Sequence, residues 1–239
     1  MKIIVDTHTH TLASGHAYST IQEMALAAKE RGMEAICFTE HAPTMPGSCS
    51  HFYFQNFRVL PRERWGMHTL FGVELNILNA KGEIDLPEPI LSKMDLGIAS
   101  IHMPCYKGNF TKEEMTEAVI RTMENPYVNI IGHPDDSRAP LDYEKVVMAA
   151  KRTGTLLEIN NSSMRPGYFR QNAHENLQEL LHYCKKYEVM VATGSDAHVD
   201  VDAGEFSNVY KILEENQFPE ELVANTSFEK LKPFLNCFK

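Results

Sequence analysis

Histidines and acidic residues follow the short apolar runs of this chain at nearly regular intervals. An early run leads into Asp6-Thr7-His8-Thr9-His10, and a late one ends in Gly194-Ser195-Asp196-Ala197-His198. If one polar residue is taken from the end of each run, successive residues are 27 to 36 positions apart. These residues are His8, His41, Glu74, His102, His133, Asn160 and Asp196. This spacing is about the length of one β-strand with its connecting helix. We therefore expect repeated units that deliver polar side chains from the same end of each strand.

The alternation of short β-rich runs with longer helical patterns predicts parallel strands joined by helical crossovers. An open sheet gathers ligands mainly where its strand order reverses, whereas a barrel brings all its strand ends to one face. The predicted fold class is thus α/β, a closed seven-stranded barrel with the site at the C-terminal ends of the strands. The expected strands are residues 3–5, 35–39, 70–75, 96–100, 128–131, 155–159 and 190–193.

One long segment, residues 42–64, has no clear assignment and is rich in proline, serine and aromatic residues. A loop of this length is uncommon in a compact domain unless it is functional, so we expect it to line or cap the site.

Length, charge and cysteine content narrow the class of protein. The 239 residues contain no low-complexity tract or flexible linker, which indicates a single domain over residues 1–239. A formal net charge of −9 makes a general nucleic-acid-binding protein an unfavourable interpretation. No apolar run approaches the roughly 20 residues needed to cross a bilayer, and the N-terminus does not resemble a signal peptide. The five scattered cysteines favour a reducing, cytoplasmic location over a disulfide framework.

The spacing of the polar residues is typical of a metal site. His8 and His10 are two positions apart, and Asp196 and His198 repeat that spacing, so each pair projects from one side of the backbone. A lone carboxylate such as Glu74 is costly to bury in an apolar strand, but a bound cation removes this cost. The two oxygens of the carboxylate can also bridge two ions. Imidazole with carboxylate suits zinc, manganese or iron. The candidate ligands are His8, His10, His16, His41, Glu74, His102, His133, Asp196 and His198.

These residues stand in motifs that resemble those of the polymerase and histidinol phosphatase (PHP) superfamily. The motifs are Asp6-Thr7-His8-Thr9-His10, Thr39-Glu40-His41, Gly72-Val73-Glu74, His102, Gly132-His133-Pro134 and Gly194-Ser195-Asp196-Ala197-His198. Within the superfamily, residues 157–163 (Leu-Glu-Ile-Asn-Asn-Ser-Ser) and the overall length resemble the YcdX-type bacterial phosphatases. The similarity spans nearly the whole chain, and every ligand position is present.

The resemblance implies a distorted (β/α)7 barrel with three divalent metal ions per chain, usually Zn²⁺ and sometimes Mn²⁺ or iron. It assigns the first ion to His8, His10, Glu74 and Asp196, the second to Glu74, His102 and His133, and the third to His16, His41 and His198. Glu74 would bridge the first two ions. Glu74 and Asp196 are accordingly expected to be the catalytic carboxylates.

Such a centre predicts hydrolysis of a small-molecule phosphoric monoester. A water molecule bridging two metal ions is acidified to a pKa of ~7, so hydroxide is available to attack phosphorus in line. Arg138 and Arg165 follow two of the strand exits. They are the candidate substrate-binding residues, because a guanidinium group binds phosphate oxygens in a fork.

Three other functions fit parts of this pattern. A phosphodiesterase or nuclease of the same superfamily is one, although the acidic chain offers no basic track for a nucleic acid. A metal-dependent amidohydrolase is another, but it commonly bridges its metals with a modified lysine, and Lys107 lies too far along its loop to replace Glu74. The third is a metal-binding module that keeps the ligands without turnover. Phe234 and Phe238 are candidate core residues or contacts of a homo-oligomer.

Overall fold

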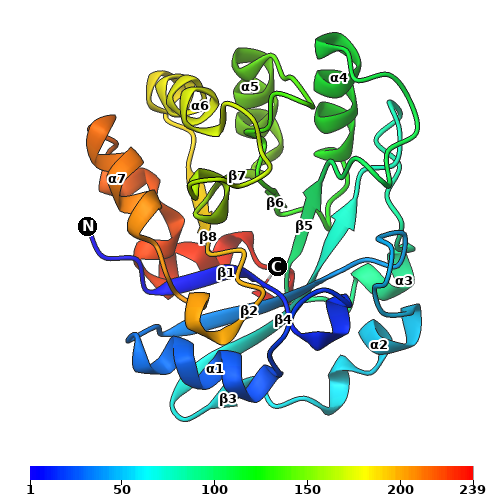
Figure 1. Cartoon of the computed structure of the whole chain (residues 1–239), viewed down its shortest axis with the longest axis vertical. Coiled ribbons are helices and arrows are strands. Elements are labelled where there is room, and N and C mark those ends of the chain that lie inside the picture. Colours follow the sequence, from blue (N-terminus) through cyan, green and yellow to red (C-terminus); the bar gives the residue numbers. More distant parts are fainter. Residues whose placement is uncertain (239) are drawn as a thin grey trace.

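The computed structural model describes residues 1–238 and contains seven parallel strands that lie side by side in chain order (Figure 1). The two-residue strand β3 (Glu63–Arg64) pairs antiparallel with the strand that follows it. The parallel strands are β1 (Val5–Thr9), β2 (Ala35–His41), β4 (Met67–Asn76), β5 (Gly97–Ser100), β6 (Ile130–Ile131), β7 (Leu156–Asn160) and β8 (Val191–Gly194).

The sheet curves until its first and last strands meet. Thr9, the last residue of β1, forms a parallel bridge with Ala197 beyond β8. The N–H of His10 donates to the carbonyl of Ala197, and the N–H of Asp196 donates to the carbonyl of His8, both at 2.9 Å. The strands thus form a nearly closed α/β barrel, which confirms the predicted fold class. Closure also joins the first histidine motif to the last.

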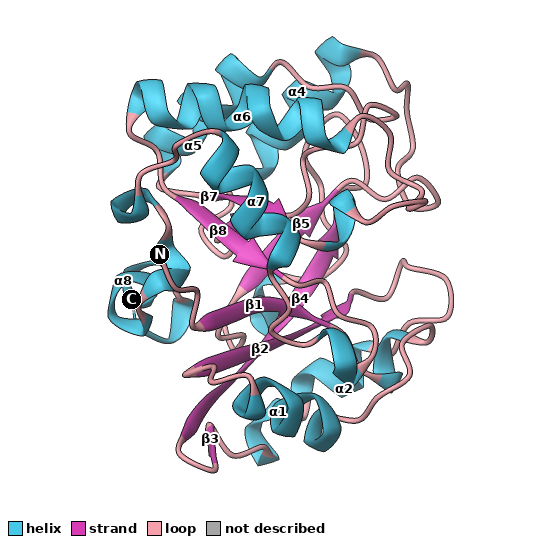
Figure 2. Cartoon of the chain, turned by 60° about the vertical axis from the view of Figure 1, so that its left-hand side comes forward, coloured by secondary structure: helices cyan, strands magenta, loops and turns pink. Residues whose placement is uncertain are grey.

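Helices cover the outside of the strands. In Figure 1, α1 and α2 lie on one side of the sheet and α4, α5 and α6 on the other, and Figure 2 shows the same arrangement from a second direction. The helices are α1 (Ile21–Glu30), α2 (His51–Gln55), α3 (Glu88–Leu91), α4 (Lys112–Thr122), α5 (Tyr143–Thr153), α6 (Ala173–Tyr187), α7 (Ser207–Glu215) and α8 (Phe228–Leu231). Among residues 1–238, no helix is both long and apolar enough to cross a membrane.

Local sequence signals fix where these helices begin and end. Helix α1 starts with a capping box, in which the side chain of Thr20 accepts the N–H of Glu23 and the Glu23 carboxylate accepts the N–H of Thr20. Helix α5 ends at Gly154, whose φ of +74° is a left-handed conformation that glycine adopts without strain.

Two apolar clusters hold the barrel together. The larger one joins strand residues such as Phe38 to helix residues such as Met24. The smaller one contains residues from the first part of the strands, including Val5 and Ile130, together with Leu231 of α8. The C-terminal segment therefore covers the end of the barrel where the strands begin. The opposite end, where the strands finish, is left for polar side chains.

The segment 42–64 is more ordered than expected. It contains α2, a short 3-10 helix (Phe57–Val59) and β3, so it is not a loop without structure. Phe54 and Phe57 are buried in the larger apolar cluster, which ties the segment to the outer face of the barrel. Only Met45 from this segment lines the cavity at the strand ends, as far as residues 1–238 show.

Candidate metal centre

The nine candidate ligands come together where the strands finish. Parallel strands end at one rim of a barrel, and this places side chains from distant parts of the sequence beside one another. His16 comes from the loop between β1 and α1 and is the only one of the nine that is exposed. The others are His8 and His10 at β1, His41 at β2, Glu74 at β4, His102 at β5, His133 at β6, and Asp196 and His198 after β8.

Glu74 is the buried carboxylate around which the imidazoles gather. Its Oε1 lies 2.8 Å from the Nε2 of His133 and 3.2 Å from the Nε2 of His102. The hydroxyl of Ser100 donates to the same oxygen at 2.7 Å. This oxygen thus faces the side chains that follow β5 and β6.

The other oxygen of Glu74 faces a different group of imidazoles. Its Oε2 lies 2.6 Å from the Nδ1 of His41 and 3.5 Å from the Nε2 of both His8 and His10. A carboxylate that bridges two metal ions must present its oxygens to two sets of ligands. Glu74 has that orientation.

Asp196 completes the group at the seam between β1 and β8. Its Oδ1 lies 3.3 Å from the Nε2 of His10 and 3.7 Å from the Nε2 of His8. Its Oδ2 faces away from these imidazoles, toward Arg170 at 3.2 Å.

A third set of imidazoles lies nearer to solvent. The ring of His16 is stacked on that of His41 with the centroids 4.8 Å apart, and its Nε2 is 3.3 Å from the Nε2 of His198. The centroids of His41 and His198 are 5.8 Å apart. His41 also belongs to the group around Glu74, so the ligand atoms form overlapping groups.

The second ring nitrogen of several imidazoles is held by a neighbouring acceptor. The Nδ1 of His8 lies 2.7 Å from the Oε1 of Glu158, and the Nδ1 of His102 lies 2.7 Å from the Oδ1 of Asn76. The Nδ1 of His10 lies 3.0 Å from the hydroxyl of Ser14. Such contacts fix the tautomer of an imidazole and leave its Nε2 lone pair for a metal ion.

The contacts of Ser14 settle the tautomer of His10. The Ser14 hydroxyl donates its one proton to the Oε2 of Glu40 at 2.7 Å, so it can only accept from His10. The Nδ1 of His10 therefore carries the hydrogen. The Glu158 carboxylate likewise only accepts, so the Nδ1 of His8 also carries a hydrogen.

When both rings are neutral, these tautomers bring two lone pairs face to face. The Nε2 atoms of His8 and His10 lie 3.0 Å apart. Among the described residues, neither the Oε2 of Glu74 nor either ring nitrogen of His41 has a partner with hydrogen-bond geometry. Buried polar atoms are usually paired, and a positive charge between these atoms would satisfy them all. The residues present therefore fit a cluster of divalent cations.

The electrostatic interactions among these side chains also favour a positive charge in the cluster. Burial opposes charge on His8, but Glu158, Glu74 and Asp196 raise the pKa of its imidazole well above the usual value. Burial lowers the pKa of His10 well below the usual value, and His41 adds to that effect. Although burial favours a neutral Glu74, the adjacent histidines keep its pKa well below the usual range. The buried carboxylates thus give the cluster a negative charge that attracts cations.

Two of the candidate ligands have an unusual backbone. His133 has a φ of +29° and Asp196 a φ of +55°, in the left-handed region that non-glycine residues rarely adopt. Residues held there cost of order 1–3 kcal/mol and cluster at functional sites. The strand-exit turns hold these two side chains toward the cluster at that cost.

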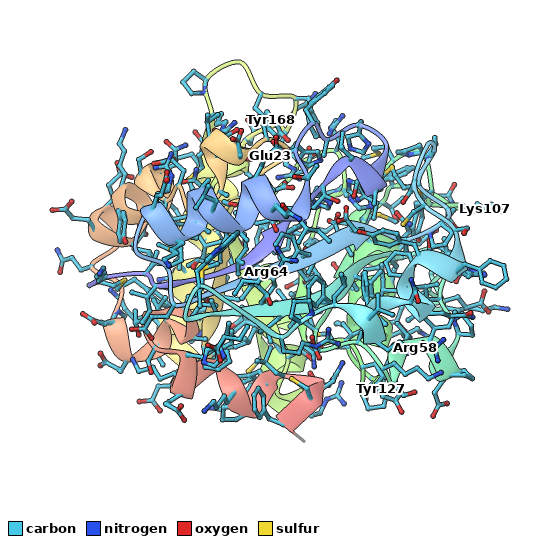
Figure 3. All side chains as sticks on the ribbon, turned by 90° about the horizontal axis from the view of Figure 1, so that it is seen from below. Glu23, Arg58, Arg64, Lys107, Tyr127 and Tyr168 are labelled. Carbon is cyan, nitrogen blue, oxygen red and sulfur yellow. The ribbon has the colours of Figure 1, made fainter. Side chains whose placement is uncertain are left out.

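A cavity of about 470 Å³ opens over the cluster. Both predicted substrate-binding residues line it, but each is paired with a neighbouring acid. Arg138 lies 2.5 Å from Asp136 and is 32% exposed, and Arg165 lies 2.8 Å from Asp202 and is 34% exposed. Tyr168, on the loop that follows β7, also lines the cavity and is labelled in Figure 3.

Arg170 is a third arginine of the cavity, and sequence reasoning missed it. Its side chain is only 6% exposed, and it donates to Ser163 at 2.6 Å and to Asn160 and Asp196 at 3.2 Å. Arg170 is not at a strand exit but ten residues beyond the end of β7. The loop brings Arg170 back to the rim of the barrel. The regular spacing of polar residues at the strand ends could not predict this position.

Two buried acids were also missed. Glu158 and Asp135 are both fully buried beside the cluster. Burial raises the pKa of Asp135 to about 7, although the charge of Arg170 partly offsets this. Alternation along β7 could have indicated Glu158, because it lies on the same face as Asn160. The bend after His133 that buries Asp135 had no such signal.

Comparison with known proteins now identifies the fold family. A model of the PHP domain matches residues 6–217, a range that begins at Asp6 and contains all nine candidate ligands. The chain belongs to the PHP family. This confirms the resemblance seen in the sequence motifs.

Relatives of this PHP protein are described as phosphatases. A "probable phosphatase" of Thermoanaerobacter sp. (strain X514) is 46% identical over 235 residues, which are 98% of this chain and 95% of that protein. A "probable phosphatase" of Acetivibrio thermocellus is 47% identical over 235 residues, with 98% and 96% covered. These relatives identify the chain as an enzyme of the phosphatase class, as predicted.

A solved structure shares the fold at low sequence identity. Histidinol phosphate phosphatase of Lactococcus lactis subsp. lactis, complexed with zinc, L-histidinol and phosphate, superposes with a TM-score of 0.62 at 20% identity. The match covers 90% of this chain and 94% of that one. It supports the barrel architecture of the PHP protein.

Proposed function

We propose that this PHP protein hydrolyses small-molecule phosphoric monoesters at a centre of three divalent metal ions. The observation that carries the proposal is the convergence of seven imidazoles and two buried carboxylates on one end of the barrel, with Glu74 among them. The zinc-containing phosphatase of the same fold from Lactococcus lactis supports both the metal and the class of ester.

The nine ligands are proposed to divide among three ions. His8, His10, Glu74 and Asp196 would hold one ion, Glu74, His102 and His133 a second, and His16, His41 and His198 a third. The orientation of Glu74, with Oε1 toward His102 and His133 and Oε2 toward His8 and His10, supports a bridging position. Imidazole and carboxylate ligation without thiolate suits Zn²⁺, with Mn²⁺ or iron as alternatives.

The amidohydrolase interpretation is less compatible with this arrangement. Such enzymes commonly use a lysine as the bridging ligand, but Lys107 is exposed and lies at the edge of the molecule (Figure 3). Glu74 occupies the central position instead.

The chemistry divides between the ions and the protein. Divalent ions held by these ligands would acidify a water molecule to a pKa of ~7 and neutralise charge on the phosphoryl oxygens. Glu74 orients the His133 ring through a hydrogen-bond contact at 2.8 Å, and Asp196 lies 3.3 Å from the Nε2 of His10. Arg138 and Arg165 would exchange their aspartate partners for phosphate oxygens when an ester enters the cavity.

The cavity wall fits the organic part of a small ester. Met45, Ile101 and Met103 supply apolar surface to the cavity. The exposed ring of Phe169 also lines it and lies 5.1 Å from the guanidinium carbon of Arg138. An apolar group next to charged groups is the usual composition of a small-molecule site.

A substrate panel tests the proposal. The purified protein, treated with a chelator and then reloaded with Zn²⁺, should hydrolyse p-nitrophenyl phosphate and histidinol phosphate faster than bis-p-nitrophenyl phosphate or single-stranded DNA. His133→Ala should be inactive, while Arg121→Met, on the outer helix α4, should keep wild-type activity. Faster cleavage of the diester or DNA would indicate a phosphodiesterase or nuclease. Bound ions without turnover of any ester would indicate a metal-binding module.

A further inference from the structure

Glu158 is a buried acid outside the nine candidate ligands. It lies in β7, and its side chain is fully buried. Its Oε1 lies 2.7 Å from the Nδ1 of His8, and its Oε2 accepts the backbone N–H of His133 at 2.7 Å. The side-chain amide of Asn160 donates to that second oxygen at 3.1 Å. One carboxylate thus connects a ligand in β1 with the ligand that follows β6.

These contacts place Glu158 behind the cluster and not among its ligands. The His8 ring lies between the two acids, with its Nδ1 on Glu158 and its Nε2 3.5 Å from the Oε2 of Glu74. Both oxygens of Glu158 already accept hydrogen bonds. They face the Nδ1 side of the His8 ring and the His133 backbone, whereas Glu74 faces the Nε2 atoms of the cluster.

The backbone around Glu158 leaves room for its carboxylate. A Cβ atom on Gly194, at the end of β8, would lie 2.2 Å from the Oε1 of Glu158 and 2.5 Å from the Cβ of His8. Real side chains do not approach that closely, so only glycine fits at this position while Glu158 and His8 are in contact. The missing side chain makes the space that the carboxylate fills.

The contact with His133 concerns its backbone. His133 has a φ of +29° and precedes Pro134, a combination with few allowed conformations. Its N–H would be buried without a partner if Glu158 did not accept it, and an unpaired buried donor is unfavourable. The same carboxylate therefore holds the His133 turn and the His8 ring in fixed positions relative to each other.

We propose that Glu158 is a positioning residue of the metal centre, which orients His8 through its ring and His133 through its backbone without binding an ion itself. This inference rests on the proposed metal-dependent function. A carboxylate behind a metal-binding imidazole fixes the tautomer and makes the other ring nitrogen a stronger ligand. Glutamine has one acceptor oxygen where glutamate has two, so Glu158→Gln leaves either the His8 ring or the His133 N–H without an acceptor.

Zinc affinity provides the test, measured by competition with a chromophoric chelator. Glu158→Gln should bind at least one Zn²⁺ about 10- to 100-fold more weakly than the wild type. Asp95→Asn is the matched control, because Asp95 is a buried carboxylate that accepts the N–H of Phe71 at 2.8 Å near the start of β5. It should keep wild-type zinc affinity. Equal affinity of Glu158→Gln and the wild type, or equal weakening in both variants, would overturn the positioning role.

A second measurement uses the wild-type protein and does not depend on the folding of a variant. In the zinc-loaded protein, long-range proton–nitrogen NMR should show a slowly exchanging hydrogen on the Nδ1 of His8 and metal binding at its Nε2. A His8 ring bound to zinc through Nδ1 would overturn the inference. If the wild-type protein binds no divalent ion, the proposed metal-dependent function itself is wrong, and this outcome is distinct from a failure of Glu158 alone.

Discussion

The Nε2 atoms of His8 and His10 lie 3.0 Å apart, and each ring has its Nδ1 held by a different acceptor. Two imidazoles arranged in this way present both lone pairs to the same space. The strand period of two puts the side chains on one side, and the contacts to Glu158 and Ser14 turn the rings. The site is therefore formed by the strands together with the residues behind the ligands.

Replacing Glu74 by glutamine should remove metal and turnover together. Glutamine keeps the shape of the side chain but loses its charge and one acceptor oxygen, so it cannot bridge two ions. We expect the loss of at least one ion per chain and a fall in kcat of at least about 100-fold. Elemental analysis and phosphate release on the same sample measure both. Glu117→Gln, at an exposed position on α4, is the control, and full activity of Glu74→Gln would contradict the bridging role.

Metal removal should lower thermal stability. An ion present at 100 times its Kd stabilises the folded state by about 2.7 kcal/mol. For a chain of this size we therefore expect Tm to fall by at least about 5 °C after chelation and to recover when Zn²⁺ is added. Differential scanning calorimetry with and without chelator measures the shift. An unchanged Tm would argue that the imidazole cluster holds no ion.

Arg138→Met should weaken substrate binding more than chemistry. Arg138 is partly exposed at the cavity and paired with Asp136, so its loss leaves the buried cluster in place. The proposed phosphate contact predicts a rise in KM of about 10-fold with kcat nearly unchanged. Steady-state kinetics on p-nitrophenyl phosphate checks this, with Arg121→Met as the reference. If KM did not change, Arg138 would not be a substrate-binding residue.

The buried Asp135 predicts a pH-dependent difference in stability. Its pKa is raised from 3.8 to about 7 in the folded protein, mainly by burial, so folding favours the protonated acid. The contribution of protonated Asp135 to the stability of the folded state is complete below pH 3.8 and is lost as the pH rises through about 7. The asparagine of Asp135→Asn cannot ionise. Between pH 4 and pH 8, the free energy of unfolding should therefore decrease less in this variant than in the wild type, and the difference should be on the order of 4 kcal/mol.

Urea unfolding of the metal-free wild type and of Asp135→Asn at both pH values tests this expectation. Asp202→Asn is a control of the same chemical type, because Asp202 is partly exposed and paired with Arg165. Parallel pH profiles for the wild type and Asp135→Asn would show that Asp135 is ionised in the folded protein.

The barrel was predictable because each strand ends in a polar residue. The regular spacing of His8, His41 and Glu74 reports the length of each β/α unit, and a parallel barrel is the fold that brings such residues together. Strand lengths were less predictable. The run at residues 128–131 has only Ile130 and Ile131 in β6, because strand pairing depends on neighbours that the sequence does not reveal.

Residues behind the ligands were harder to find than the ligands. Glu158 shares a face of β7 with Asn160, but its role depends on Gly194 and His8, which are distant in the sequence. Arg170 reaches the rim through a loop, and loop geometry does not follow the strand period. The division of ligands among three ions, the single domain, the cytoplasmic location and a homo-oligomer all stay predictions.

Anomalous X-ray diffraction from zinc-loaded crystals would locate the bound ions themselves. We expect three anomalous peaks at the strand ends, with the Glu74 carboxylate between two of them and with His16, His41 and His198 around the third. A map without peaks at this end of the barrel, or with Glu74 in contact with no ion, would contradict this expectation.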